Sequence, residues 1–393
     1  MKKVFLGAAT LALLSTSAYA TKARLLALGD EVEDNYYTMD DRYIFTNASF
    51  VNNYGDMVVL EYGAEGVGGN STTLDTDDAP KAMGGFFKKV GNFTYGAYLG
   101  NESNISTSLR ILSSDFTTGY LPSSDSQIDL FIGGKAGVNW GASFIYASSE
   151  RRVNTAAPLP VASYETEDSA MAVKLGVNKD NWDAYSNISL NSESENKDTG
   201  NKFDGTLGVQ VGGSYTFNQD LKTYASYKTF TWDQIRGGND EDGKLSRLDL
   251  GVGKEYKIDG GMAFIRTAFQ VINVEVDATA GKAKLETMNL PVVIGAEGKA
   301  TEWLTLRGSV SQSIFSNADS KGLNAYTAAG NDPLAVAVVE SYHGSLTDGE
   351  TSFENTTRVN LGATLTYKTV DLDLYFGADG ENTDSRVAMK YNF

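Results

Sequence analysis

The sequence predicts an all-β fold, a transmembrane antiparallel up-and-down β-barrel of about sixteen strands, and fourteen or eighteen strands also fit the pattern. Three observations lead to this fold. The chain opens on an export signal, most of it alternates apolar and polar residues between turns, and its last strand ends on an aromatic residue. We expect residues 1–20 to be a signal peptide, 21–54 a periplasmic or lumen-facing segment, and 55–393 the barrel.

The first twenty residues have the parts of a secretory signal peptide. Lys2 and Lys3 precede an apolar stretch over residues 4–14, and Ala18-Tyr19-Ala20 places small residues where signal peptidase reads them. Cleavage is expected after Ala20. An uncleaved anchor is the alternative, but the apolar stretch is too short to cross a bilayer, so we expect an exported protein.

The composition excludes several classes of protein. Without the two signal lysines, 31 Lys and Arg stand against 50 Asp and Glu, a net charge of −19 that would repel the phosphates of nucleic acid. With no cysteine and one histidine, neither disulfides nor a metal site built from Cys or His is expected, and nothing implies a cofactor. The single histidine, His343, lies in a long polar stretch, which gives an outer-membrane hydrolase little support.

Apolar and polar residues alternate with a period of two from about residue 55 onward, which is typical of strands. One example places Leu207, Val209, Val211, Gly213, Tyr215 and Phe217 on one face, and a second places Val359, Leu361, Ala363, Leu365 and Tyr367 together. After residue 20 there is no run of about eighteen apolar residues, which excludes helical membrane spans.

The connections between these strands alternate in length. Tight turns are expected around residues 90–91, 135–137, 178–180, 218–219, 258–260, 300–301 and 368–369. Longer polar stretches lie at 64–80, 101–124, 150–164, 195–202, 235–243, 277–283, 317–352 and 379–384. Seven turns on one side and eight loops on the other require sixteen strands, with both chain ends on the side of the turns.

Aromatic residues gather at the expected strand ends. A soluble sandwich also alternates, but in hydrocarbon a sheet must close on itself and face lipid with apolar residues. Tryptophan and tyrosine prefer the boundary between headgroups and acyl chains. We therefore expect Trp140, Trp182, Trp232, Trp303 and Tyr367 to lie at the membrane interface.

The last residues form a specific pattern. Val387, Met389, Tyr391 and Phe393 alternate with smaller or polar residues, and the chain stops on Phe393. This pattern resembles the C-terminal strand signature of Gram-negative outer-membrane proteins, which the barrel-assembly machinery reads. The resemblance implies a location in the bacterial outer membrane, among its lipid and lipopolysaccharide.

The polar face of the strands is expected to line the lumen. The inward phase holds basic residues and carboxylates, namely Lys174, Arg247, Arg266, Arg307 and Arg358 with Asp129, Asp249, Glu255, Asp371 and Asp373. Arginines facing carboxylates resemble the constriction of general porins, and the resemblance implies a trimer that lets small hydrophilic solutes diffuse through a water-filled lumen. The alternative is that the two sets pair as salt bridges that brace the wall.

Two longer stretches are candidates for a loop that narrows the lumen. Residues 317–352 contain a mildly apolar run with Leu334, Val336 and Val338, and residues 101–124 contain Phe116 and Tyr120. Long exterior loops also cap barrels or contact neighbours, so both readings stay open.

The residues before the first strand do not alternate. Residues 23–28 look like one or two helical turns ended by Gly29. Asp40-Asp41 and then Asn47-Ala48, just before a strand at 57–62, are similar to the start of the long-chain fatty-acid transporter family. That resemblance implies a hatch in the lumen and a plugged transporter for hydrophobic ligands. The alternative is a segment that only braces the inner wall.

Overall fold

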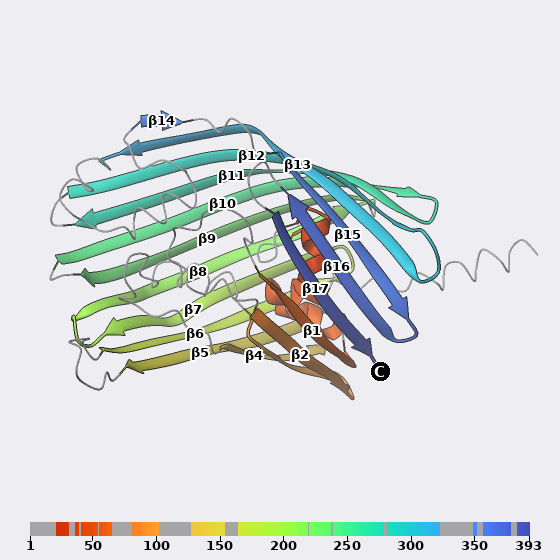
Figure 1. Cartoon of the computed structure of the whole chain (residues 1–393), viewed down its shortest axis with the longest axis horizontal. Coiled ribbons are helices and arrows are strands. Elements are labelled where there is room, and N and C mark those ends of the chain that lie inside the picture. Colours follow the sequence, from red (N-terminus) through yellow and green to blue (C-terminus); the bar gives the residue numbers. More distant parts are fainter. Residues whose placement is uncertain are drawn as a thin grey trace, which may run out of the picture.

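The computed structural model is a single closed β-barrel (Figure 1). It describes residues 21–30, 36–38, 41–53, 55–64, 81–101, 127–153, 164–218, 220–236, 239–278, 281–322, 349–351, 357–378 and 383–393. Among these residues, no helix is both long and apolar enough to cross a membrane. The signal peptide predicted for residues 1–20 lies outside the described residues.

The barrel has seventeen strands that fill sixteen places around its circumference. The strands are β1 (Met57–Ala64), β2 (Lys81–Val90), β3 (Phe93–Leu99), β4 (Gln127–Lys135), β5 (Asn139–Val153), β6 (Tyr164–Lys179), β7 (Trp182–Asn196), β8 (Asn201–Phe217), β9 (Leu221–Arg236), β10 (Asn239–Ile258), β11 (Gly261–Ala278), β12 (Gly281–Lys299), β13 (Leu304–Lys321), β14 (Gly349–Thr351), β15 (Arg358–Tyr367), β16 (Val370–Ala378) and β17 (Thr383–Asn392). Short β14 and β15 both pair with β13 and share one position. Antiparallel pairing of β1 with β17 closes the sheet, so the predicted sixteen-stranded barrel is confirmed.

The seven expected tight turns are all present, and each joins two neighbouring strands. Three of them contain a non-glycine residue with positive φ, Asp180, Asn218 and Lys368, which is a conformation that tight hairpin turns require. The tight turns lie at one end of the barrel, the end at which the chain finishes with Phe393.

Three of the expected longer loops are short. The strands continue to within a few residues of each other between β7 and β8, β9 and β10, and β11 and β12. Of the predicted loops, 195–202 is reduced to a turn at residues 197–200, and the described residues of 235–243 and 277–283 are strand. These segments have polar residues on both faces, a pattern that is typical of a loop in a sequence. In the structure they are the parts of the strands that extend past the apolar exterior of the wall.

The outward phase of the strands is apolar next to the tight turns. Large exposed side chains there include Leu175, Leu207, Val211, Leu250, Ile265, Ile294, Leu306 and Leu361. The inward phase is polar or small, and most of it is buried. A closed sheet with an apolar exterior satisfies every backbone group within hydrocarbon, which is the solution that membrane β-barrels adopt.

The wall has two heights, and Figure 1 shows the difference. Strands β5 to β13 are 15 to 20 residues long, whereas β15 to β17 and β1 to β4 have 7 to 10. A tilted strand of about 9–11 residues is enough to cross a membrane. The nine long strands therefore extend beyond the bilayer at the end opposite to the tight turns.

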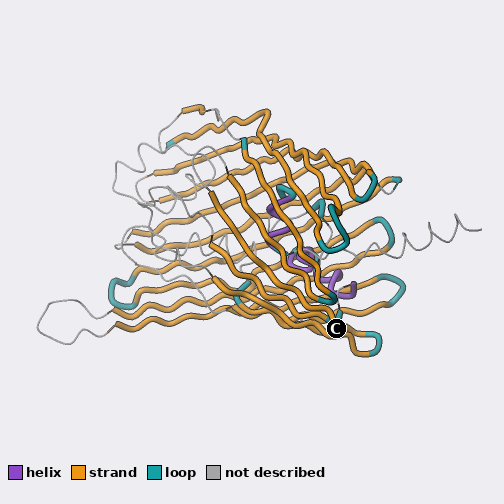
Figure 2. Tube along the Cα trace, turned by 45° about the vertical axis from the view of Figure 1, so that its right-hand side comes forward, coloured by secondary structure: helices purple, strands orange, loops and turns teal. Residues whose placement is uncertain are grey.

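The described residues of 21–53, which we call the plug segment, lie inside the barrel. They form α2 (Lys22–Ala27) and the 3-10 helices η1 (Asp41–Phe45) and η2 (Ala48–Asn53), which Figure 2 shows enclosed by strands. The Thr21 hydroxyl caps α2 by accepting a hydrogen bond from the Arg24 backbone N–H at 3.3 Å. A buried apolar cluster joins η1 and η2 to the short wall and comprises Tyr43, Ile44, Phe45, Phe50, Val51, Met57, Val59, Met83, Phe87, Tyr98 and Phe131.

Candidate functional site: the contact between the plug segment and the wall

A row of inward glycines receives η2. Gly133 on β4, Gly141 on β5 and Gly176 on β6 are cross-strand partners in turn. An added Cβ would overlap the Ala48 carbonyl at Gly141 and the Asn47 side chain at Gly176. These three glycines form a shelf on which the backbone of the plug segment lies directly against the wall.

Asn47 links the start of η2 to the wall. Its Oδ1 accepts hydrogen bonds from the backbone N–H and the hydroxyl of Ser49, at 3.1 and 2.6 Å. Its Nδ2 donates to Asp183 on β7 at 3.1 Å, and the Tyr43 hydroxyl donates to the same carboxylate at 2.9 Å. Asn178 on β6 donates to the Ser49 hydroxyl at 2.7 Å. All five side chains are buried, so each of these polar groups needs the partner that the plug segment or the wall supplies.

A second contact joins α2 to β12, β13 and β16 through ion pairs. Arg24 binds Glu297 through two bonds of 2.9 Å, and Arg307 donates to the same carboxylate at 2.7 Å. Arg307 also lies 3.3 Å from Asp373, which accepts a hydrogen bond from the Thr21 hydroxyl at 2.9 Å. The Arg307 side chain is fully buried, so its charge depends on these two carboxylates.

Glu61 on β1 is the centre of a third contact. Its carboxylate accepts the Lys22 backbone N–H at 2.6 Å and pairs with Arg42 at 3.1 Å. Arg42 also donates to Asn101 at 2.6 Å, and its guanidinium lies 4.0 Å from the centre of the Phe45 ring. A single buried carboxylate therefore connects α2 and η1 to the wall.

The opposite side of the barrel contacts residues 28–38. Arg266 on β11 pairs with Asp30 at 3.1 Å and donates to the Leu28 carbonyl at 2.6 Å. Tyr36 stacks on Tyr224 of β9, with ring centres 4.2 Å apart. Together, these contacts hold the plug segment to strands on opposite sides of the barrel, so it spans the interior.

All ten residues predicted to line the pore lie on the inward phase. Three contact the plug segment: Lys174 donates to the Phe45 carbonyl, while Arg266 and Asp373 make the contacts described above. Arg307 reaches it through Glu297, which Arg24 also binds. Others pair along the wall, as in Arg247 with Asp249 at 2.8 Å and Arg358 with Asp384 at 2.5 Å. Asp129 accepts from Gln127 at 3.0 Å, Asp371 accepts from Thr366 at 2.7 Å, and Glu255 lies near the tight turns. Lining of a pore stays a prediction.

The sequence interpretation missed the centres of the site. Arg24, Arg42, Glu61, Asp183 and Glu297 were not among the predicted residues, nor were the three shelf glycines. The available signal was weak: Glu61 follows an apolar run, and Glu297 and Asp183 sit singly on the inward phase of alternating strands. Only their partners in residues 21–53, distant in sequence, distinguish them from other polar inward residues.

The prediction that Trp232 lies at the membrane interface is wrong. It is only 2 % exposed and points inward, and a Cβ at Gly243 would overlap its ring. Trp182 and Tyr367 are exposed on the outward side beside tight turns, and Trp140 lies on the same phase. Trp303 is exposed within the turn that precedes β13. Trp232 is on the part of β9 that extends past the apolar exterior, where alternation places it inside.

The C-terminal pattern lies on the outside of the barrel. Val387, Met389, Tyr391 and Phe393 are on the outward phase of β17, and the Phe393 ring stacks near Phe86 with centres 5.8 Å apart. Recognition by assembly machinery stays a prediction. The two candidate constricting stretches, 101–124 and 317–352, fall mostly outside the described residues, as does His343.

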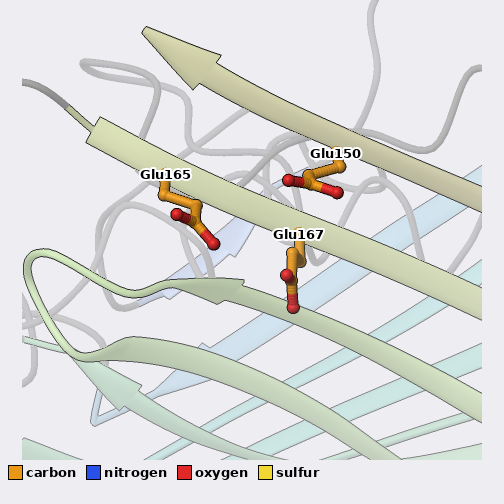
Figure 3. Close-up of side chains that lie close together, drawn as sticks. All are labelled: Glu150, Glu165 and Glu167. Atoms are coloured by element: carbon orange, nitrogen blue, oxygen red, sulfur yellow. The ribbon is translucent and has the colours of Figure 1, made fainter. Parts of the chain in front are cut away.

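Three carboxylates meet on the outer surface, at the far end of β5 and β6 (Figure 3). Glu150, Glu165 and Glu167 have oxygens within 4.8 Å of one another, a spacing that could hold a metal ion. Two cations already bind them: Arg152 lies 3.0 Å from Glu165, and Lys197 lies 2.8 Å from it. Hydrogen bonds from Lys197 and Arg152 lower the pKa of Glu165, and bonds to Glu165 and Glu167 raise the pKa of Lys197. This group is an exposed ion-pair network.

The closed sheet, its apolar exterior and the enclosed N-terminal residues define the class of protein: a transmembrane β-barrel of the kind found in bacterial outer membranes, with an internal plug segment. No family model matches the chain, and no curated protein does.

Among solved structures, the chain is similar to the toluene transporter TodX of Pseudomonas putida, with 12% identity, 95% of this chain and 98% of that chain covered, and a TM-score of 0.36. The toluene transporter TbuX of Ralstonia pickettii gives 12% identity, coverage of 96% and 99%, and a TM-score of 0.37. A porin of Rhodopseudomonas blastica gives 9% identity, coverage of 86% and 99%, and a TM-score of 0.32.

Proposed function

We propose that this protein is an outer-membrane transporter for apolar ligands whose lumen is closed by the plug segment until a ligand or a change in the wall displaces it. The observation that supports this most is the set of buried contacts that hold residues 21–53 across the barrel, from Glu61 on β1 to Arg266 on β11. A segment held on opposite sides crosses the lumen, so a solute that passes through the barrel would have to displace it.

An inward apolar patch supports an apolar ligand. It lies on the part of the wall beyond the plug segment and comprises Phe230, Trp232, Leu245, Val274, Val276 and Leu285, all buried. Cross-strand pairing makes it continuous, because Leu245 is opposite both Phe230 and Val274, and Val274 is opposite Leu285. The lumen of a wide, water-filled barrel is normally lined with polar side chains. An apolar surface inside the barrel instead favours binding of an apolar ligand, because both surfaces are removed from water.

A disulfide lock tests whether the plug segment closes the path. The chain has no cysteine, and the Ser49 hydroxyl lies 2.7 Å from Asn178 Nδ2, so cysteines at these positions are close enough to be tried as a disulfide. In intact cells that express the double variant, we expect an apolar dye such as 1-N-phenylnaphthylamine to enter after reduction and to be excluded after oxidation. The single Ser49→Cys variant is the control.

The same protein in planar bilayers gives a second measurement. We expect little conductance from the intact chain and a stable channel from a variant that lacks residues 21–53. If the deletion does not fold, the cysteine pair still decides the question. Equal dye entry in the oxidised and reduced forms would show that the plug segment does not close the path, and so would equal conductance from the intact chain and a folded deletion variant.

Passive diffusion of small hydrophilic solutes is the second candidate. It is favoured by charged inward pairs that do not involve the plug segment, such as Arg247 with Asp249. This function predicts steady conductance from the intact protein and swelling of proteoliposomes in small sugars, both unchanged by the disulfide.

A further inference from the structure

A trough crosses the outer surface of β9 to β13, at their far ends. Its volume is about 670 Å³, and two parallel rows of outward side chains border it. The first row runs through Thr231, Lys244, Glu275, Lys284 and Lys321, each paired with the next across the sheet. The second, two residues further from the tight turns, runs through Asp233, Asp242, Asp277 and Lys282.

The trough lies on the exterior of the barrel. The charged members of both rows are exposed, whereas Trp232, Val276 and Ala283, which lie between the rows, point inward and are buried. The backbone of those residues and of Gly243 therefore forms the floor.

The height of the trough places it among lipid headgroups. On each of β10, β11 and β12, the first row lies four residues beyond the last apolar outward residue, which is Leu248, Val271 and Met288 respectively. Four residues of tilted strand correspond to roughly 9 Å along the barrel axis. On these three strands the apolar exterior therefore ends below the trough, whereas on β9 one apolar outward residue, Ile235, lies beyond it.

The lysines of the trough take part in exposed ion pairs, as in Lys321 with Asp319 at 2.7 Å, which a phosphate could replace. Lys284 pairs with Glu275 at 2.9 Å, but both side chains are about half exposed, and exposed pairs of this kind contribute little to stability. Hydrogen bonding to Glu275 raises the pKa of Lys284, so it stays charged. A phosphate with two or three negative oxygens would replace these weak pairs by stronger contacts.

The aspartate row indicates which groups the ligand carries beside its phosphate. Asp233 and Asp242 face each other across neighbouring strands, and like charges in this arrangement repel. Burial, with the nearby charge of Asp242, raises the pKa of Asp233. Hydroxyl groups donated to these carboxylates would relieve the repulsion, and sugars supply them in pairs.

We propose that this trough binds the phosphorylated sugar headgroup of an outer-leaflet glycolipid, lipopolysaccharide, with Lys244, Lys284 and Lys321 holding phosphate and the aspartate row holding sugar hydroxyls. The site is on the outside of the wall and does not depend on the plug segment. It fixes the barrel to the polar part of the leaflet along the long strands β9 to β13.

The test compares two matched double variants of the full chain in detergent. Lys244→Gln with Lys284→Gln removes charge from the trough, and Lys197→Gln with Lys202→Gln removes the same charge from exposed lysines at the outer ends of β7 and β8. Purified deep-rough lipopolysaccharide is titrated and followed by thermophoresis. We expect about a tenfold weaker affinity for the trough variant and less than about a twofold change for the control, since each phosphate contact is charge-assisted.

Two competitors test whether the trough recognises lipopolysaccharide or any phosphate. Phosphatidic acid in mixed detergent micelles and inorganic phosphate, at the same phosphate concentration, should compete poorly, because neither carries the paired hydroxyls of a sugar. Equal loss of affinity in both double variants would overturn the proposal, and so would equal competition by either probe. A difference in gel migration between unheated and heated samples, equal to that of the wild type, confirms that each variant is folded.

Discussion

The side chain of Asn47 occupies the space that a Cβ at Gly176 would fill. This one contact places the start of η2 against β6, and the same Asn47 donates to Asp183 on β7. Alanine at position 176 cannot coexist with the present position of Asn47.

Gly176→Ala is therefore expected to displace the plug segment while leaving the wall intact. We expect a conductance in planar bilayers that the wild type lacks, with a loss of unfolding free energy of about 1–3 kcal/mol, typical of overpacking. Gly298→Ala is the control, because the nearest atom to its Cβ is 3.8 Å away. A closed Gly176→Ala barrel with wild-type stability would contradict the prediction.

Glu297→Ala should be strongly destabilising, because it removes a partner from both Arg24 and Arg307. The Arg307 side chain has no exposed surface, so its charge would keep only Asp373 at 3.3 Å. We expect a loss of about 3–5 kcal/mol in denaturant unfolding, the usual cost of breaking a buried pair. Glu286→Ala, on the part of the same strand beyond the apolar exterior, serves as control and should change stability little. A loss below about 1 kcal/mol for Glu297→Ala would mean that water replaces the carboxylate.

The orientation of Trp232 can be read by fluorescence. A variant with Trp140, Trp182 and Trp303 replaced by Phe leaves Trp232 as the only indole. Because Trp232 points inward and is buried, we expect brominated lipids not to quench it. A variant that keeps only Trp182, which is 37 % exposed on the outward phase of β7, should be quenched strongly. Similar quenching of both would place Trp232 in contact with lipid.

The exposed ion pairs around Glu165 should depend on pH. Hydrogen bonds from Lys197 and Arg152 lower the pKa of Glu165 from its ordinary value of 4.5, so the ionised form is favoured in the folded protein. The associated stabilisation is present above that value and is lost as the pH falls through the lowered pKa. We expect faster amide exchange, corrected for intrinsic rates, at the outer ends of β6 and β7 in acid, and the Glu165→Gln variant should abolish this change.

The sequence predicted the barrel better than the site. Period-two alternation and the seven tight turns set the strand number, because a membrane forces one face to be apolar along the whole span. Beyond the bilayer that constraint ends, which explains why residues 235–243 looked like a loop and why Trp232 was placed on the wrong side. The contacts of Glu61 and Glu297 join residues far apart in the chain, and no local pattern marks such partners.

The hydrogen bond between Thr21 and Asp373 joins residues 352 positions apart. It cannot form before β16 has taken its place beside β17, at the seam where β17 meets β1. The first described residue of the chain therefore depends on one of its last strands for its position. The two ends of the sequence thus hold each other in place: the strands that close the barrel also pack against α2 inside it.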